Sequence, residues 1–287
     1  MAIIRPMEGS PFDAVVFAGG GNRCLWQAGF YETVAPAIGL APTFASGSSA
    51  GATIACMTLA GRAGRALEHF KEATGRNRRN VYPLNAWRKA PVFPHYEMYR
   101  RTIVESLGPD GFDKLRATAD VRVQLTRLPP WLGPRLGAAL GLAAYQVEKA
   151  LSNPVHQAAS RRLGFRPDVA RVHDCADVEA LADLLLASSC APPFMPVLRH
   201  GGRVAIDGGV VENVPVAAVE GDAERILVLL TRTYAPASIP HVPGRTYVQP
   251  SRDLPIGKFD YTRPDGLQEA YDLGLEDGAR YLTRRSA

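Results

Sequence analysis

Three short segments of this sequence contain the residue types that acyl-transfer chemistry requires. The first, Gly19-Gly-Gly-Asn-Arg23, is rich in glycine; the second is a Gly-x-Ser-x-Gly motif centred on Ser49; the third is Asp207-Gly-Gly. Acyl transfer needs an activated nucleophile, a base, and N–H donors directed at the developing oxyanion. Each segment can supply one of these groups.

Ser49 lies between a predicted strand over 43–46 and a predicted helix over 50–59. A nucleophile elbow has this strand–serine–helix order, and glycines two residues before and after the serine let strand and helix approach closely. Ser46 and Ser48 are nearby, but only Ser49 has glycine at both positions. Because a lone motif of this kind also occurs in ordinary tight turns, Ser49 is at this point a candidate nucleophile.

The glycine run follows a predicted strand over 13–18 and precedes a predicted helix over 25–38. Such a loop presents backbone N–H groups at a helix N-terminus, which suits a phosphate or an oxyanion. A dinucleotide site would need a third glycine where this chain has Cys24, and a P-loop would need a lysine. An oxyanion hole and a structural turn remain. Arg23 would either steady the loop by bonding backbone carbonyls or meet a lipid phosphate, and the structural role is favoured.

Asp207 follows a predicted strand over 203–206, and the two glycines after it allow its carboxylate to turn inward. A carboxylate that takes the serine proton directly needs only to lie within about 3 Å of the hydroxyl. Among the histidines, only His241 fits the chain order of a Ser–Asp–His triad, and it lies in a proline-rich loop. The sequence is therefore compatible with a Ser49–Asp207 dyad and with a triad that adds His241. Asn213, two residues before a proline, is predicted to cap a helix.

Together, these segments resemble the motifs of the patatin-like phospholipase family. Two further stretches fit the resemblance: Ala187-Ser-Ser-Cys-Ala-Pro-Pro-Phe-Met-Pro-Val197, and the Asn-x-Pro that ends at Pro215. The likeness covers residues 13–220 and is weak over 62–180. It implies a three-layer α/β fold and lipid acyl hydrolysis by a Ser–Asp dyad through an acyl-enzyme, without histidine or metal.

Carried over residue by residue, the resemblance makes Ser49 the nucleophile and Asp207 the general base. It assigns the oxyanion hole to the loop that contains Gly19, Gly20, Gly21 and Arg23, with the N–H groups around Gly20 and Gly21 as donors. The family often has glycine after the arginine of the first motif, where this chain has Cys24. This departure bears on the shape of the loop, and it is tolerable if position 24 is already helical.

The alternation of strands and helices around these motifs is typical of an α/β fold with a parallel sheet. Further strands are predicted over 121–126, 225–231 and 246–250, and further helices over 178–188 and 266–282. We predict a single three-layer α/β/α domain over 1–287 with a mostly parallel central sheet. Its core motifs lie in 13–220, with a helical insertion over about 62–165 and a C-terminal strand and helix in 221–287.

Composition limits the function classes further. With 46% hydrophobic residues the chain can bury a sizeable core. Its four cysteines lack paired or zinc-type spacing, so we predict free thiols in a reducing compartment and no metal or other cofactor. The first six residues are too short and too soon interrupted for a signal peptide. These features favour a cytoplasmic protein, and they are compatible with peripheral association with a membrane.

Basic residues raise the net charge to +5 and cluster at 76–79 and 161–166. No nucleic-acid-binding signature accompanies them, so we predict no nucleic-acid partner. The expected partners are a phospholipid or acylglycerol substrate and an anionic membrane surface, with the apolar stretch 128–147 lining the entrance for acyl chains. A plain core helix is the alternative for 131–150. The rival functions are a triad esterase of the α/β-hydrolase type and a catalytically inactive lipid-binding protein.

Overall fold

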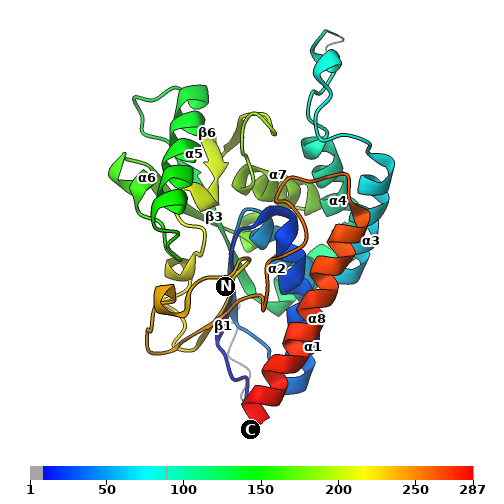
Figure 1. Cartoon of the computed structure of the whole chain (residues 1–287), viewed down its shortest axis with the longest axis vertical. Coiled ribbons are helices and arrows are strands. Elements are labelled where there is room, and N and C mark those ends of the chain that lie inside the picture. Colours follow the sequence, from blue (N-terminus) through cyan, green and yellow to red (C-terminus); the bar gives the residue numbers. More distant parts are fainter. Residues whose placement is uncertain (1–8, 88–89, 287) are drawn as a thin grey trace.

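The computed structural model describes residues 9–87 and 90–286, and Figure 1 shows how its elements are arranged. The prediction about a signal peptide concerns residues that lie outside this description. Eight strands form one sheet in the order β5-β6-β3-β2-β1-β7-β8, with β4 paired to β3. The strands are β1 (Ala14–Phe17), β2 (Phe44–Ser48), β3 (Asp120–Arg127), β4 (Arg166–Arg171), β5 (Leu198–His200), β6 (Arg203–Asp207), β7 (Ile226–Leu229) and β8 (Arg245–Val248).

Helices surround the sheet. The α-helices are α1 (Leu25–Ile38), α2 (Ala50–Leu59), α3 (Ala63–Arg76), α4 (His95–Thr118), α5 (Pro134–Leu151), α6 (Ala159–Arg162), α7 (Val178–Ser188) and α8 (Pro264–Ser286). Short 3-10 turns include η1 (Gly21–Cys24), η2 (Pro83–Ala86), η4 (Gly208–Val210) and η5 (Val216–Ala218). The segment 62–165, predicted as a helical insertion, supplies α3, α4, α5 and α6 and also the strand β3.

The sheet is mostly parallel. Strands β3, β2, β1, β7 and β8 run parallel to one another, whereas β4 and β6 pair antiparallel with β3, and β5 pairs antiparallel with β6. Every residue of β1 is buried, as expected for a central parallel strand covered on both faces. Val15 and Phe17 face the large core formed with the helices, and Ala14 and Val16 face a second core with residues 214–219. The predicted three-layer α/β fold is confirmed.

The helix pair α1 and α8 forms one side of the molecule (Figure 1). Their backbones approach closely because glycines lie at the crossing. A Cβ atom on Gly29 would lie 2.1 Å from the Tyr271 carbonyl oxygen, and one on Gly274 would lie 2.2 Å from the Trp26 carbonyl oxygen. Since α1 follows the glycine run directly, this contact helps to fix the position of that loop.

Helix α5 packs through one stripe of its surface. Gly137, Ala138, Gly141 and Tyr145 are buried, at spacings that place them on one helical face. Ala138 belongs to a small core with residues of β6 and η4. The opposite face carries exposed apolar side chains, so α5 is not the plain core helix that was the alternative for this stretch. No helix in the described part of the chain is long and apolar enough to cross a bilayer.

Candidate active site

Ser49 occupies the sharp turn between β2 and α2. Its backbone has φ 55° and ψ −136°, a positive-φ conformation that is strained for any residue but glycine and is typical of functional sites. Glycines make the turn possible. A Cβ atom on Gly51 would lie 2.5 Å from the carbonyl oxygens of Phe17 and Ala18, and one on Gly47 would lie 2.4 Å from the backbone of α2. The predicted elbow is therefore present.

Strand β3 brings Ser49 and Asp207 together. Strand β4 occupies one edge of β3, so β2 and β6 share the other edge and meet end to end there. Ser48 of β2 lies opposite Gln124, and Asp207 of β6 lies opposite the next residue, Leu125. The register of two strands on a third thus positions two residues that are far apart in the sequence.

The two side chains form a direct hydrogen bond. The Ser49 hydroxyl donates to Asp207 Oδ2 at 2.8 Å. The other carboxylate oxygen, Oδ1, accepts the Gly209 N–H at 2.7 Å, and the Asp207 N–H donates to the Cys190 carbonyl at 2.8 Å. Both carboxylate oxygens are thereby oriented, with Oδ2 directed at the serine. This is the geometry that proton transfer from serine to carboxylate requires.

The electrostatics of Asp207 suit a proton acceptor. Burial raises the pKa of its carboxyl above the ordinary value of 3.8, outweighing the hydrogen bonds from Ser49 and Gly209 and the charge of Lys258, which act to lower it. A carboxylate with a raised pKa is a stronger base than an exposed aspartate. Asp207 therefore gains proton affinity from its surroundings.

Ser188, at the end of α7, supports the elbow. Its hydroxyl accepts the Ser49 N–H at 2.9 Å and donates to the Gln124 carbonyl at 2.7 Å. This links the backbone of the strained residue to β3. Ser188 lies in the stretch 187–197 that resembles the family, but the sequence predicts no role for it. Nothing local indicates which of the two adjacent serines faces the elbow.

The glycine run lies against the elbow. A Cβ atom on Gly19 would lie 3.4 Å from Ser49 Cβ. The Gly19 N–H donates to the Asn213 carbonyl at 2.9 Å, and so it is engaged in the protein itself. Among the described residues, neither the Gly20 nor the Gly21 N–H has a hydrogen-bond partner. Within the glycine run, these two N–H groups can therefore donate hydrogen bonds to a negatively charged oxygen near Ser49.

Asn213 and Thr231 fix the position of the glycine run by hydrogen bonds. Asn213 Nδ2 donates to the Gly19 carbonyl at 3.0 Å, and the Thr231 hydroxyl donates to the same oxygen at 2.7 Å. The prediction that Asn213 caps a helix was wrong, because only the 3-10 turn η5 follows and its N-cap is Pro215. The side chain turns instead to the glycine run, a contact that depends on residues distant in sequence.

Residues 249–263, between β8 and α8, cross the glycine run from the other side; we call them the strap. Asn22 donates from its N–H to the Lys258 carbonyl at 3.1 Å and from Nδ2 to the Asp260 carbonyl at 2.7 Å. Arg23 Nε donates to the Ile256 carbonyl at 3.0 Å. Arg23 thus bonds a carbonyl, as in the structural interpretation of that residue. Cys24 is buried with helical backbone angles, so position 24 needs no glycine.

His241 does not approach the pair. It is exposed and lines a separate surface hollow with Pro243 and Tyr247. The hydrogen bond between Ser49 and Asp207 leaves no imidazole between them. Within the described residues, no group of three or more His, Cys, Asp or Glu side chains is placed to hold a metal ion.

Comparisons with known proteins place the chain in a family. The sequence model of the patatin-like phospholipase family matches residues 15–219, which include the glycine run, Ser49 and Asp207. The chain belongs to the patatin-like phospholipase family. The crystal structure of VipD from Legionella pneumophila is similar over 96% of this chain and 67% of that chain, with a TM-score of 0.45 and 11% identity. No curated protein sequence matches the chain significantly.

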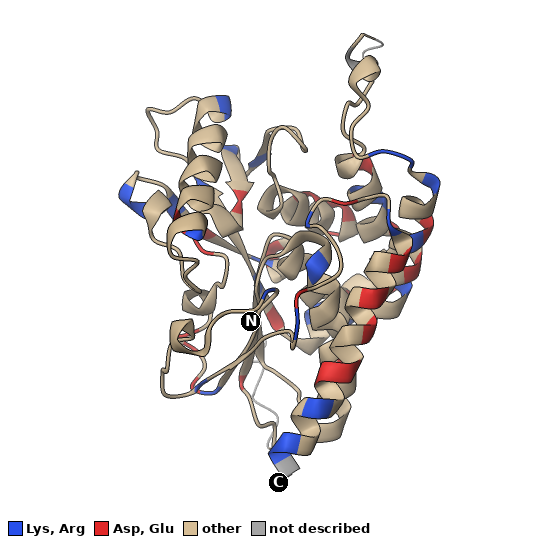
Figure 2. Ribbon diagram, in the orientation of Figure 1, with Lys and Arg blue, Asp and Glu red and all other residues tan. Residues whose placement is uncertain are grey.

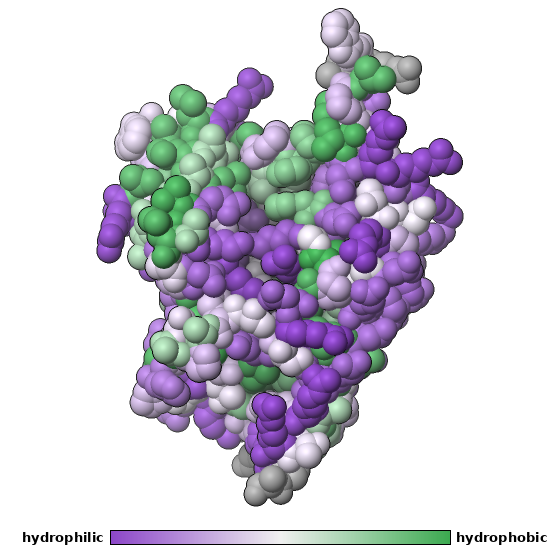
Figure 3. Space-filling view, viewed as in Figure 1, coloured by the Kyte–Doolittle hydropathy of each residue, from purple (hydrophilic) through white to green (hydrophobic). Residues whose placement is uncertain are grey.

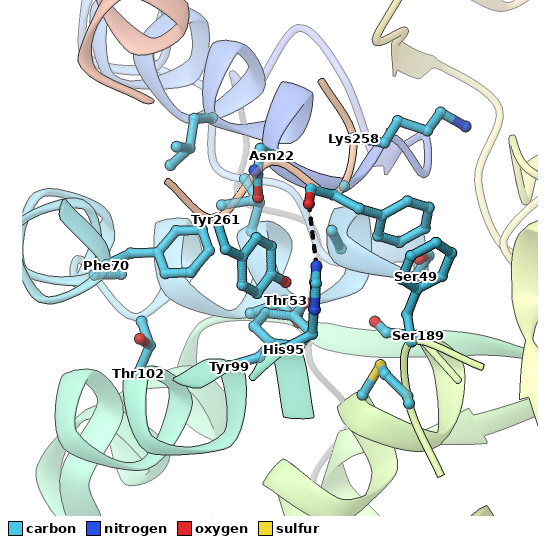
Figure 4. A pocket seen from close by; sticks show the side chains of 18 of the residues that line it. Asn22, Ser49, Thr53, Phe70, His95, Tyr99, Thr102, Ser189, Lys258 and Tyr261 are labelled. Carbon is cyan, nitrogen blue, oxygen red and sulfur yellow. Dashed lines mark hydrogen bonds between the residues drawn. The ribbon is translucent and has the colours of Figure 1, made fainter. Parts of the chain in front are cut away.

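Patatin-like phospholipases are lipid hydrolases, and this member has a largely apolar cavity beside Ser49 (Figure 4). Ile54 and Met57 of α2 and Phe70 of α3 line it. His95 also lines it and donates from Nε2 to the Phe259 carbonyl at 3.0 Å; burial lowers the pKa of this imidazole, which favours its neutral form. The walls are suited to a hydrocarbon chain.

Proposed function

We propose that the protein hydrolyses carboxylic esters of lipids by a Ser49–Asp207 dyad. The observation that carries the proposal is the 2.8 Å hydrogen bond from the Ser49 hydroxyl to Asp207 Oδ2 at a strained elbow. Family membership supports lipid as the substrate class. The absence of an imidazole between the two residues favours the dyad over the triad with His241.

In the first half of the reaction, Ser49 Oγ attacks the ester carbonyl carbon while its proton passes to Asp207 Oδ2. The N–H groups of Gly20 and Gly21, at the N-terminus of η1, stabilise the oxyanion of the tetrahedral intermediate. Collapse of the intermediate breaks the ester bond. The departing alcohol takes the proton from Asp207, and the acyl group stays on Ser49.

In the second half, water attacks the acyl-enzyme and gives its proton to Asp207. The second tetrahedral intermediate uses the same N–H donors, and its collapse returns the proton to Ser49 Oγ. The products are a carboxylic acid and the free enzyme. One base serves both halves because Asp207 is ionised again after each leaving group departs.

The cavity supports an acyl chain as the group that Ser49 receives. In Figure 4, Ser49 lies on one side of the cavity and Phe70 on the other, with the rings of Tyr99, His95 and Tyr261 between them. A fatty acyl chain extending from Ser49 toward Phe70 would be removed from water, at about 0.8 kcal/mol per buried methylene. This gain favours long-chain esters over short ones.

The direct test measures hydrolysis of phospholipid and acylglycerol substrates by the wild type, Ser49→Ala and Asp207→Asn. Each substitution should reduce kcat by about 10⁴-fold or more, and Ser49→Ala should abolish labelling by a fluorophosphonate. His241→Ala is the control and should retain the wild-type rate. Activity in folded Asp207→Asn within about tenfold of wild type would exclude the dyad. A wild type that neither labels nor hydrolyses would favour the inactive lipid-binding alternative.

We also propose that the enzyme meets its substrate at a membrane surface, through α5 and the segment around η2. Both lie at the same end of the long axis (Figure 1). Trp131 and Leu136 are 74% and 71% exposed, and Leu84 and Trp87 are 71% and 90% exposed. Figure 3 shows apolar surface over α5. Exposed apolar side chains of this size on two projecting elements favour insertion into a lipid interface.

Basic side chains accompany both elements. Lysine and arginine residues colour the segments 76–79 and 161–162 in Figure 2, beside the apolar projections. A groove lined by Leu136 and Met195 leads from α5, and Met195 also lines the cavity beside Ser49. An acyl chain can therefore pass from the exposed face of α5 toward Ser49 along apolar surface.

A further inference from the structure

Four basic side chains lie near one another, and one of them, Lys258, lines the cavity beside Ser49. The four are Arg23, Lys149, Arg232 and Lys258. They come from η1, α5, the segment after β7, and the strap. Burial lowers the pKa of the Lys149 ammonium, and the charges of Lys258, Arg232 and Arg23 lower it further. The four charges are therefore close enough to repel one another.

None of the four forms an ion pair with a carboxylate in the described part of the chain. Elsewhere basic side chains are commonly paired, as Arg127 is with Asp168 and Arg225 with Asp13. Lys258 Nζ lies 3.2 Å from the Tyr145 hydroxyl and 5.3 Å from the centre of its ring. Burial acts to raise the pKa of Tyr145, but the charges of Lys258 and Arg232 outweigh it and lower that pKa. The cluster thus has excess positive charge.

Arg232 shows the lack of a counter-ion most clearly. Its Nε donates to the Tyr234 hydroxyl at 2.7 Å, and its guanidinium lies 5.1 Å from the centre of the Tyr234 ring. Both terminal nitrogens are shielded from solvent and have no hydrogen-bond partner among the described residues. A guanidinium kept from water without an acceptor is costly. An anion beside the cluster would remove this cost.

The cluster is tied to the glycine run, and one of its members lines the cavity beside Ser49. Thr231, the residue before Arg232, bonds the Gly19 carbonyl, and Lys258 bonds Asn22 through its own carbonyl. Lys258 lines the same cavity as Ser49. In Figure 4 its side chain lies on the same side of the view as Ser49, and its terminal nitrogen points away from the cavity. An ester at Ser49 with its acyl chain toward Phe70 would place its alcohol portion toward the cluster.

We propose that this cluster binds the phosphate of the substrate headgroup, so that the enzyme prefers phosphate-bearing glycerolipids to neutral acylglycerols. The proposal rests on the proposed ester hydrolysis at Ser49. Arg232 and Lys258 supply charge-assisted hydrogen bonds to phosphate oxygens, Lys149 adds charge from α5, and the Tyr145 hydroxyl donates a further bond. Headgroup binding would fix which ester carbonyl reaches Ser49.

The test compares two soluble substrates that differ only in the headgroup, dihexanoyl phosphatidylglycerol and dihexanoylglycerol. The preference is the ratio of their kcat/KM values. We expect Lys149→Met and Lys258→Met each to reduce this ratio about tenfold, and the double variant to reduce it further. Lys114→Met removes an exposed lysine of α4 and is the matched control, with the ratio unchanged. A double variant with the wild-type ratio would overturn the proposal.

A binding measurement separates this proposal from the hydrolysis on which it rests. Ser49→Ala should gain thermal stability from sn-glycerol 3-phosphate but not from glycerol, and the Lys149 and Lys258 substitutions should abolish the gain. An absent gain would overturn the headgroup site even in an active enzyme. An equal gain from inorganic phosphate would also overturn it, because the cluster would then be a free-anion site. A phosphate-specific gain in a protein without esterase activity would reject the hydrolysis alone.

Discussion

Asp207 is subject to two opposing influences, since burial disfavours its charge while Ser49 and Gly209 donate hydrogen bonds to it. Burial dominates and the pKa is raised, yet the base must be ionised to accept the serine proton. We therefore expect kcat/KM for a soluble ester to rise with pH through a midpoint above 3.8, the ordinary aspartate value. A pH–rate profile of the wild type and His241→Ala measures this. A midpoint at or below 3.8, or one that moves in His241→Ala, would contradict the assignment.

The same shift predicts a cost in stability. A carboxyl whose pKa is raised on folding stabilises the native state below its unfolded pKa and loses that contribution as pH rises through the folded value. At neutral pH the ionised Asp207 is therefore unfavourable for folding. We expect Asp207→Asn to raise the free energy of unfolding at pH 7 by about 1 kcal/mol while it abolishes activity. Thermal unfolding at decreasing pH should show this advantage shrinking; an advantage that grows toward acid would refute the sign.

Ser188 allows a prediction with an adjacent control. Ser188→Ala leaves the buried Ser49 N–H without its acceptor, at a cost of about 1–3 kcal/mol, and releases the strained elbow from β3. We expect lower stability and a kcat reduced by about 10–100-fold, which corresponds to that range. Ser189→Ala removes the adjacent buried hydroxyl, which interacts with Tyr99 and not with the Ser49 N–H, and should cost less stability than Ser188→Ala. Denaturant unfolding and steady-state kinetics compare the two, and equal effects would remove the proposed role of Ser188.

At the scale of elements, sequence patterns predicted the helices better than the edge of the sheet. The predicted helices over 25–38, 50–59 and 178–188 are confirmed as α1, α2 and α7. Their apolar runs are long and bounded by glycine or capping residues, so local signals suffice. Strands β4 and β5 were missed. β4 is polar and largely exposed, without the alternation that marks a half-buried strand, and β5 is very short, so only their partners in the sheet define them.

The crossing of α1 and α8 gives a test at this scale. Gly274→Ala would place a methyl group 2.2 Å from the Trp26 carbonyl, so the helices must separate. We expect a loss of about 1–3 kcal/mol and reduced turnover, because α1 carries the glycine run. Gly64→Ala is the control, since this exposed glycine of α3 has open space and alanine should stabilise the helix by about 0.5–1 kcal/mol. Thermal unfolding distinguishes them, and a neutral Gly274→Ala would show that the crossing is not tightly constrained.

At the scale of the whole molecule, the sequence identified the two residues that the structure brings into hydrogen-bond contact, but not the residues that support them. Ser49, Asp207 and the glycine run lie in short motifs whose spacing along the chain is informative. Ser188, Asn213 and the strap act through contacts between distant segments, and a single sequence contains no local signal for such contacts. The basic cluster was missed for the same reason, because its members come from four separate elements.

The proposed membrane contact is also a property of the whole molecule. The sequence has three tryptophans, and Trp26 is buried while Trp87 and Trp131 are exposed on the two projections. We expect anionic vesicles to shift tryptophan emission to the blue and to sediment with the protein, with binding reduced by salt. Replacing Trp87 or Trp131 by phenylalanine should each remove part of the shift. Emission and sedimentation indifferent to anionic lipid and to salt would exclude the proposed surface.

The strap determines when the site is completed during synthesis of the chain. Ser49 and Asp207 both precede residue 208, yet the loop beside them is held by carbonyls of Ile256, Lys258 and Asp260. During synthesis the ribosome delivers the chain from its N-terminus, so these carbonyls arrive last among the parts of the site. We expect a nascent chain stalled before the strap to carry both reacting residues and remain inert. On this expectation, the proposed nucleophile Ser49 becomes active only after the strap has been synthesised.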